Sequence, residues 1–343
     1  MDQTFVCCST YHVYVSILEA YKHKKLGHES VLVFFDDAIR GIGGFLESVE
    51  RIGIFKKIIV VQGYTIMRNM KKQYGWWQYI TGRAKIIVDL YEKNNTELVE
   101  YQDFIANSQI NLFQLNRTRA YFLIKYPDNF FRMYEDGYGV YQQKLPALRR
   151  LNRKYITKLP LLKGHDPQVK EVWVSFPEKV TDKILIPKLR KLDIDALENQ
   201  LTETEKRDIV QQMVGDINLR AEQSTIIITQ PLSEDGYCSE ATKIELYRKL
   251  VEQELADGNL VYIKTHPRER TVYPFDNANV ILLPKFFPLE VFNLGSLKIS
   301  KAVSFFSTAL FNLKHVGDKV MYSEDYVVKE IAKCAKTANP CKR

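Results

Sequence analysis

Short apolar runs alternate with longer stretches of helical periodicity through the first 135 residues. The runs are rich in β-branched and aromatic residues, whereas the stretches between them repeat apolar residues three or four positions apart. Strands that alternate with helices in this way form a parallel sheet with helices on both faces. We expect strands at 4–9, 30–35, 57–61, 104–107 and 130–134, and helices at 13–24 and 118–125.

The same alternation returns after residue 223, with predicted strands at 224–229, 260–264 and 280–283 and a helix at 240–255. Between the two halves, residues 140–170 are basic and interrupted by proline and glycine, and residues 193–223 are charged and helical in character. The sequence therefore predicts an α/β protein with two doubly wound, Rossmann-like domains facing a central cleft. The expected boundaries are an N-terminal domain at 1–155, a linker and helical segment at 156–223, and a C-terminal domain at 224–343.

Length and composition suit a two-domain globular protein, because the chain has 343 residues and 45% of them are apolar. No run approaches the roughly 18–20 apolar residues that a membrane span requires. The start of the chain, Met1-Asp2-Gln3-Thr4, lacks the basic residues of a secretory signal, so we expect a cytoplasmic protein. The five cysteines have no metal-ligand spacing and are odd in number, so we expect reduced thiols rather than disulfides.

The net charge of +8 is concentrated in two regions. The first, at 144–163, has no acid; its basic residues are Lys144, Arg149, Arg150, Arg153, Lys154, Lys158 and Lys163. The second mixes Arg68, Lys71, Lys72, Arg83 and Lys85 with Tyr64, Tyr74, Trp76, Trp77 and Tyr79. Such regions bind nucleic acid, an anionic membrane surface or a glycolipid, unless they are simply solvated surface. No nucleic-acid-binding motif is present, so we favour the membrane or glycolipid.

Polar residues cluster where predicted strands end. Gln-Pro-Leu-Ser-Glu-Asp-Gly at 230–236 follows one strand, Thr-His-Pro-Arg at 265–268 follows the next, and Ser-Phe-Phe-Ser-Thr at 304–308 precedes a helical stretch at 309–314. Ligands bind at the carboxyl ends of parallel strands, and a helix start with hydroxyls accepts an anion. Each motif alone is explained by a turn or a helix cap, but together they predict a phosphate site. His12, just past the first strand, either lines the cleft or is a loop histidine.

Three short motifs occur here in an order shared by several families of bacterial sialyltransferases: Glu135-Asp136-Gly137, His266-Pro267 and Ser307-Thr308. The blocks "IIITQPLSEDGYCSE" and "VYIKTHPRERTVYP" resemble glycosyltransferase family 52, whose members carry Thr-Gln-Pro-Leu after one strand and Lys-x-His-Pro-Arg after the next. "FRMYEDGYGVY" resembles the family's acidic strand end. The similarity covers scattered blocks from about residue 4 to 322 and is strongest at 224–310. It implies a GT-B-like fold and transfer of a sugar from a nucleotide donor.

The resemblance also implies roles for individual residues. His266 would contact the phosphate of a CMP-sugar and act as general acid for the departing nucleotide, and Ser307 and Thr308 would hold the same phosphate. The other donor-binding residues that it implies are Gln230, Glu234, Gly236, Pro267, Arg268 and Ser304.

The general base must be a carboxylate, and two regions offer one. Related families place the base in the first-half acidic pair, which corresponds to Glu135 or Asp136, whereas family 52 places it upstream of the His-Pro, where Asp235 is the best match. We favour Asp235. A carboxylate, a proton donor and fixed hydrogen-bond donors are sufficient for this chemistry, so we expect no metal and no cofactor. The one Asp-x-Asp, at 193–195, lies in the charged helical segment and reads as a helix start.

The resemblance implies an inverting sialyltransferase that moves sialic acid from CMP-sialic acid to a terminal galactose-type acceptor, a galactoside or glycolipid of lipooligosaccharide or capsule. Two alternatives are a different donor, such as a UDP-hexose, and a non-catalytic glycan-assembly subunit. Family members dimerise by exchanging N-terminal portions, which implies a homodimer with a hinge at about 95–126. We expect no nucleic-acid partner, and we expect association with the inner face of an anionic membrane.

Overall fold

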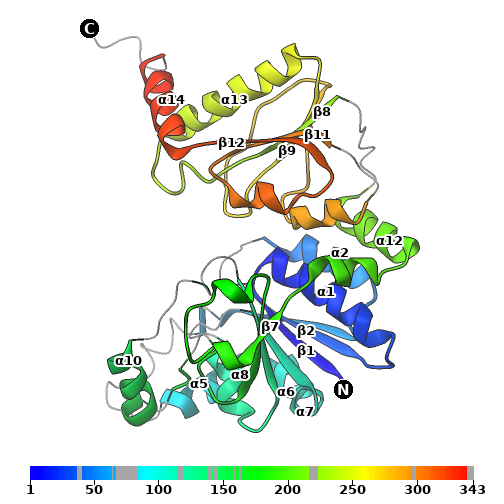
Figure 1. Cartoon of the computed structure of the whole chain (residues 1–343), viewed down its shortest axis with the longest axis vertical. Helices are drawn as coiled ribbons and strands as arrows, with labels where there is room; N and C mark the ends of the chain where they lie inside the picture. The colour runs from blue at the N-terminus through cyan, green and yellow to red at the C-terminus, as the bar shows by residue number, and fades with distance from the viewer. Residues whose placement is uncertain are drawn as a thin grey trace. The chain divides into compact units, whose positions relative to one another are not determined.

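The computed structural model divides the chain into two compact units, Met1–Thr202 and Glu203–Arg343. Each unit contains one sheet whose paired strands are all parallel, with helices on both faces (Figure 1). The predicted α/β class with two Rossmann-like halves is therefore confirmed. The structure describes residues 1–36, 41–63, 65–66, 83–113, 119–136, 141, 146–157, 159–161, 164–215, 223–295 and 299–337.

Unit 1 is built on a seven-stranded sheet with the order β3-β2-β1-β4-β5-β6-β7. The strand order reverses direction at the β1–β4 pair, which is where doubly wound sheets bind ligands. Strands β1, β2 and β4 are buried at every position, as expected for parallel strands covered on both faces. The strands are β1 (Gln3–Cys7), β2 (Ser30–Phe35), β3 (Lys57–Val61), β4 (Gln109–Phe113), β5 (Phe131–Tyr134), β6 (Val169–Val174) and β7 (Leu189–Lys191).

The helices of unit 1 lie on opposite faces of this sheet, with α1 on one face and α5 to α8 on the other (Figure 1). Helix α1 starts at a capped end, because the Ser9 side chain accepts the N–H of His12 at 3.2 Å. The helices are α1 (Thr10–Lys24), α2 (Gly43–Arg51), α5 (Arg83–Asn94), α6 (Thr96–Glu100), α7 (Gln102–Ala106), α8 (Ala120–Lys125), α10 (Ala147–Leu151), the π-helix η1 (Asn152–Thr157), the 3₁₀ turns η2 (Pro177–Lys179) and η3 (Ile186–Lys188), and α11 (Ile194–Asn199).

Unit 2 has a five-stranded sheet with the order β10-β9-β8-β11-β12. Helices α13 and α14 lie on one face, and α12, η4 and η5 on the other (Figure 1). The strands are β8 (Ser224–Ile228), β9 (Leu260–Lys264), β10 (Val280–Leu282), β11 (Ile299–Phe305) and β12 (Val316–Tyr322). The helices are α12 (Glu203–Val214), α13 (Glu240–Ala256), η4 (Leu289–Asn293), η5 (Thr308–Asn312) and α14 (Glu324–Thr337).

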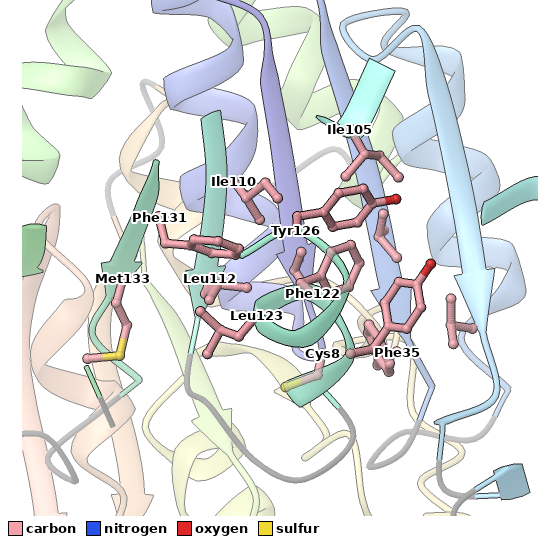
Figure 2. Packing of buried hydrophobic residues seen from close by; sticks show 14 of the residues in the cluster. Cys8, Phe35, Ile105, Ile110, Leu112, Phe122, Leu123, Tyr126, Phe131 and Met133 are labelled. Atoms are coloured by element: carbon pink, nitrogen blue, oxygen red, sulfur yellow. The ribbon is translucent and has the colours of Figure 1, made fainter. Parts of the chain in front are cut away.

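The core of unit 1 joins helix α8 to the middle of the sheet. Figure 2 shows Phe122 and Leu123 of α8, with Tyr126 just beyond it, packed toward Ile110 and Leu112 of β4. All five side chains are buried. Full burial of one such side chain contributes about 1.5–3 kcal/mol, so this packing fixes β4 against α8.

The expected strand at 104–107 is wrong. Residues 102–106 form helix α7, and the fourth strand is β4, a few residues later. Polar residues at 109 and 111 made the β4 segment look solvated. In the fold Asn111 is fully buried, and its side-chain N–H₂ donates to the Gln3 side chain of β1 at 2.9 Å. A buried polar residue that is hydrogen-bonded to another strand in this way leaves no apolar signature in the sequence.

The boundary between the units also differs from the expected one. Residues 156–223 were expected to form a linker and helical segment, but β6 and β7 lie within them and extend the first sheet. The two units therefore separate between Thr202 and Glu203. Strands β11 and β12 also have no counterpart in the expected list. The basic-aromatic region at 64–85 falls almost wholly outside the described residues; Lys85 is exposed on α5.

Gly164 tests the packing between β5, β6 and the segment that precedes β7. Its φ is +82°, and a Cβ there would lie 2.9 Å from Met133 Cε and 3.1 Å from Val172 Cγ2. We expect Gly164→Ala to lower the unfolding free energy by about 2–4 kcal/mol, the sum of left-handed backbone strain and overpacking, as measured by urea denaturation.

Gly27→Ala is the matched control, because Gly27 has a φ of +79° but no atom within 4 Å of the added Cβ. It should lose only the backbone part, about 1–2 kcal/mol. Equal losses in the two variants would show that Gly164 has no packing role.

Candidate active site

Three loops meet at the carboxyl edge of the unit 2 sheet, because β8 lies between β9 and β11 in a parallel arrangement. The loop after β8 carries the predicted residues at 230–236, the loop after β9 carries those at 265–268, and the turn after β11 carries Ser307 and Thr308. The fold therefore brings together three blocks that are separated by about thirty residues or more in the sequence. The β8 and β9 loops are held to each other by a buried charge network.

Lys243 of α13 is the centre of that network. Its side chain is fully buried, and its Nζ lies 2.9 Å from Glu234 Oε2 and 3.0 Å from Glu269 Oε2. The ammonium also donates to the Thr271 hydroxyl at 2.8 Å. Glu234 belongs to the β8 loop and Glu269 to the β9 loop, so one buried cation ties both loops to helix α13. Such a cation is stable in the interior only when paired and hydrogen-bonded.

Glu269 holds the His-Pro turn in place. One carboxylate oxygen accepts the main-chain N–H of His266 at 2.9 Å and the hydroxyl of Thr229. The other oxygen accepts the Tyr273 hydroxyl at 2.8 Å in addition to its contact with Lys243. Glu269 is 1% exposed, so all of its hydrogen-bonding capacity is used inside the protein. Glu269 therefore affects the site by positioning the main chain of His266.

Glu234 holds the other side of the β9 loop. Its Oε1 accepts the main-chain N–H of Arg270 at 2.6 Å. Burial by itself opposes ionisation of this carboxyl, but the Arg270 N–H and the Lys243 ammonium outweigh it and lower the pKa of Glu234 to about 2. Glu234 was expected to bind the donor, and the structure places its carboxylate on protein groups instead.

Asp235, Arg268 and His266 form the accessible part of this cluster. Arg268 donates to both carboxylate oxygens of Asp235, at 2.9 and 3.0 Å, in a bidentate pair. Its main-chain N–H donates to Nδ1 of His266 at 3.1 Å. The side chains of Arg268 and Asp235 are 52% and 35% exposed. The predicted base, the predicted acid and the cation predicted to bind the donor are thus neighbours in one unit.

The tautomer of His266 follows from this contact. Because Nδ1 accepts a hydrogen bond, the ring proton is on Nε2, which is then a hydrogen-bond donor. Burial, with repulsion from Arg268 and Lys264, lowers the pKa of His266 to about 4. The ligand-free ring is therefore neutral at pH 7. An anion bound beside it would offset the repulsion and raise the pKa toward the range in which the ring transfers a proton.

Lys264 stands directly behind the His-Pro turn. Its Nζ donates to the main-chain oxygens of Thr265 at 3.0 Å and Lys285 at 2.7 Å, and lies 4.7 Å from the centre of the Phe287 ring. Burial lowers the pKa of Lys264 to about 7. Lys264 is 4% exposed, and its buried ammonium fixes the end of β9 through these two hydrogen bonds.

The remaining β8-loop residues shape the main chain. The N–H of Gln230 donates to the Tyr247 hydroxyl at 2.6 Å, which fixes the end of β8 on helix α13. Gly236 has a φ of +81°, in the left-handed region where only glycine is unstrained. The turn is closed by the N–H of Asp235, which donates to the Pro231 oxygen at 2.8 Å. This geometry turns the Asp235 carboxylate toward Arg268.

The β11 turn differs from the expected hydroxyl cluster. Ser304 is fully buried in β11, and its hydroxyl donates to the Ile228 oxygen of β8 at 3.0 Å, so it joins two strands. Ser307 precedes the single 3₁₀ turn η5, which begins at Thr308 in place of the expected helix at 309–314. Phe306, just before them, has a φ of +35°. A non-glycine residue held in this strained region is typical of functional loops.

In unit 1, the acidic pair after β5 has two different environments. Glu135 is 7% exposed. Its carboxylate accepts the hydroxyl of Tyr141, the hydroxyl of Ser175 and, at 2.9 Å, the N–H of Ser175. These bonds tie the ends of β5 and β6 together. Asp136 is the accessible member of the pair, with a side chain that is 31% exposed.

Asp136 contacts a buried histidine at the sheet's switch point. Its Oδ1 lies 3.1 Å from Nε2 of His12, whose side chain is fully buried. Nδ1 of His12 accepts the Cys8 N–H at 3.2 Å, and the ring stacks on Phe113 with 4.6 Å between centroids. Burial opposes charge on both groups, but their neighbours outweigh it: Cys8 and then Asp136 raise the pKa of His12, and the hydrogen bond to His12 lowers the pKa of Asp136. His12 is therefore not a loop histidine: it lies fully buried in the first turn of α1 and contacts Asp136 from inside.

Comparison with known proteins decides the family. The model of glycosyltransferase family 52 matches residues 53–332. This chain belongs to glycosyltransferase family 52. It is therefore a glycosyltransferase, and the matched range includes Asp136, Asp235 and His266. An uncharacterized protein of Haemophilus influenzae is 31% identical over 242 residues, which cover 68% of this chain and 77% of that protein.

Solved structures show the fold of this family 52 chain but not its substrate. A Methanocaldococcus jannaschii UDP-GlcNAc 2-epimerase, in complex with UDP-GlcNAc and UDP, is similar over 97% of this chain and 92% of its own, with a TM-score of 0.50 and 10% identity. The Neisseria meningitidis UDP-GlcNAc 2-epimerase bound to UDP-GlcNAc matches 90% of this chain and 79% of its own, at 15% identity and a TM-score of 0.47. The first likeness agrees with two Rossmann-like domains.

Two features are absent from the described part of the chain. No helix there is long and apolar enough to cross a membrane. Within the same residues, no group of three or more His, Cys, Asp or Glu side chains is arranged to hold a metal ion.

Lys243→Met tests the buried network. Removal of the cation leaves Glu234 and Glu269 facing each other without compensation, so we expect the unfolding free energy to fall by about 3–5 kcal/mol, measured by urea denaturation. Lys56→Met is the control, because the Lys56–Glu29 pair is 46% and 56% exposed and should contribute little. Similar stabilities of the two variants would argue against the network's role.

The ionisation of His266 gives a pH prediction. With a pKa of about 4 in the ligand-free protein, its ring resonances should be constant above about pH 6 and move only in more acidic solution. Inorganic phosphate should raise the midpoint, because an adjacent anion favours the charged ring. NMR titration measures both, with His266→Ala to assign the signal. A ligand-free midpoint near 6.5, the ordinary value, would contradict the described environment.

Proposed function

We propose that this glycosyltransferase moves sialic acid from CMP-sialic acid to a terminal galactose-type acceptor on a bacterial surface glycan, such as lipooligosaccharide or capsule. The observation that carries the proposal is the arrangement around His266. Its Nε2–H is a donor on a turn fixed by Glu269, and Arg268, the neighbouring cation, is half exposed. A neutral donor, a guanidinium and the turn at Ser307-Thr308 suit the single phosphate of a CMP leaving group.

His266 acts on the leaving group in this proposal. In the ligand-free protein it is a hydrogen-bond donor through Nε2, and the bound phosphate raises its pKa so that it protonates the departing CMP. Arg268, Ser307 and Thr308 bind the phosphate, and Gln230, Gly236 and Pro267 shape the surrounding turns. The bond between the sugar and the phosphate oxygen breaks as the acceptor oxygen attacks the sugar from the opposite face, which inverts the anomeric centre.

Two carboxylates are candidates for the base that takes the acceptor's proton. Asp235 lies beside His266 but uses both oxygens on Arg268. Asp136 contacts His12 through one oxygen, and its pKa is lowered, so it is ionised at neutral pH. Glu135 is occupied by Tyr141 and Ser175. We keep Asp235 as the first candidate, because it shares Arg268 with His266, and the variants below separate it from Asp136.

A different donor, such as a UDP-hexose, is the alternative within the family. A non-catalytic assembly subunit is the alternative outside it, and the accessible Asp235, Arg268 and His266 cluster favours an enzyme. The homodimer with exchanged N-terminal portions stays a prediction.

The test is transfer from CMP-sialic acid to lactose by purified protein in EDTA, followed by CMP release and sialyl-lactose formation. We expect metal-independent turnover that falls by about 10²–10⁴-fold in His266→Ala, the range for loss of a positioned acid. A similar loss in Asp235→Asn and little change in Asp136→Asn would identify Asp235 as the base; the reverse result would identify Asp136.

His315→Ala is the control, because His315 is an exposed histidine of the same unit, outside the three loops. Release of UDP from a UDP-sugar without turnover of CMP-sialic acid would replace the donor and keep the enzyme class. Absence of turnover with every donor, together with unchanged glycan assembly in cells that carry His266→Ala, would support a non-catalytic role.

A further inference from the structure

The segment formed by α10 and η1 exposes large apolar side chains. Leu148 is 82% exposed, Leu151 51%, Tyr155 63% and Ile156 63%. Side chains of this kind are usually buried in soluble domains, and a group of them on one element marks an interaction surface. In Figure 1, α10 lies at the periphery of unit 1, away from the sheet.

The four apolar residues have helical spacing. Relative to Leu148, the others follow at three, seven and eight positions, which places them along one side of a continuous helical run from α10 into η1. We refer to these four residues as the apolar stripe.

The charge around the apolar stripe has a single sign. Seven basic residues and no acid lie between residues 144 and 163. Arg149, Arg150 and Lys154 occupy sequence positions between members of the stripe, and Arg150 is exposed. Arg153 is different: it is 8% exposed, and its guanidinium donates to the Pro160 oxygen at 2.5 Å.

That bond belongs to a set of contacts that shape the segment. The N–H of Arg150 donates to the Pro146 oxygen at 3.0 Å, and the N–H of Leu159 donates to the Arg153 oxygen at 3.1 Å. The N–H of Leu161 donates to the Asp166 carboxylate at 2.6 Å. The apolar stripe is therefore presented by a folded segment that is tied down beyond its end.

An exposed apolar stripe within a purely basic segment matches one kind of partner. A nucleic acid would be bound by the charges but offers nothing to the leucines and isoleucine. A second copy of this segment would bring like charges together. An anionic bilayer satisfies both features, because apolar side chains enter the boundary between headgroups and acyl chains while basic ones contact acidic headgroups.

We propose that the α10–η1 segment docks this protein on an anionic lipid surface, with the apolar stripe inserted at the boundary between headgroups and acyl chains. This assigns the expected membrane contact to one surface of unit 1. It is independent of the donor sugar, because lipid binding is measured without turnover.

The test is co-sedimentation of the whole protein with phosphatidylcholine vesicles that contain or lack phosphatidylglycerol. We expect binding only to the anionic vesicles, weakened by added salt. The triple variant Leu148→Ser, Leu151→Ser, Ile156→Ser should bind at least about tenfold more weakly, since each change removes a large apolar group from the insertion. Leu26→Ser is the matched control, because Leu26 is 65% exposed in unit 1 but lies outside the segment.

A second variant tests the proposal if the triple variant does not fold. Arg150→Glu keeps the apolar stripe and reverses one exposed charge, and it should also weaken binding to anionic vesicles. Thermal unfolding checks that each variant is folded. Unchanged vesicle binding by folded variants, equal binding to neutral vesicles, or a concentration-dependent dimer that the variants abolish without any vesicle binding in the wild type would each overturn the proposal.

Discussion

The cation of Lys243 lies buried between two carboxylates, and the geometry of the unit 2 site depends on it. Glu234 and Glu269 come from different loops, and the Glu269 carboxylate, which is 1% exposed, would be unstable in the interior without a cation. Once paired, their other oxygens accept main-chain N–H groups of the β9 loop, from Arg270 and His266. The carboxylates that pair with the buried Lys243 therefore also fix the position of the β9 loop. The partly buried His266 and the exposed Asp235 and Arg268 lie next to this network.

The charges around His266 determine the protonation state of its ring. Its surroundings are cationic, with Arg268 beside it and Lys264 behind it, and burial also disfavours charge on the ring. These surroundings therefore disfavour an imidazolium and favour a bound anion. A phosphate changes both conditions at once, because it neutralises the cations and stabilises a proton on the ring. In the proposed function, phosphate binding and protonation of His266 are therefore coupled.

The candidate site of unit 1 depends on a single contact, between His12 and Asp136. His12 lies in the first turn of α1, after β1, and Asp136 follows β5, so their contact joins the carboxyl ends of two parallel strands near the point where the strand order reverses. Glu135, adjacent in sequence, points its carboxylate into hydrogen bonds with Tyr141 and Ser175. Two neighbouring acids are thereby separated in role: one fixes the sheet edge and the other stays accessible. The basic, apolar segment α10–η1 belongs to this unit and gives it a surface of a different character.

The sequence alone determined the α/β class, most of the buried strands, and the three blocks that meet in unit 2, because apolar runs and strand-end motifs are local signals. It also pointed to family 52 through the Thr-Gln-Pro-Leu and His-Pro-Arg blocks. Strand β4 was misplaced because its polar residue Asn111 is buried and donates a hydrogen bond to Gln3 in the core. The linker was misplaced because β6 pairs with β5 after a basic, irregular stretch of sequence, and β7 then pairs with β6. Only the tertiary structure showed that Ser304 joins strands, that Glu135 is occupied, and that Lys243 is buried. A lysine inside a charged amphipathic helix looks solvated in the sequence; its burial depends on carboxylates that two distant loops bring to it.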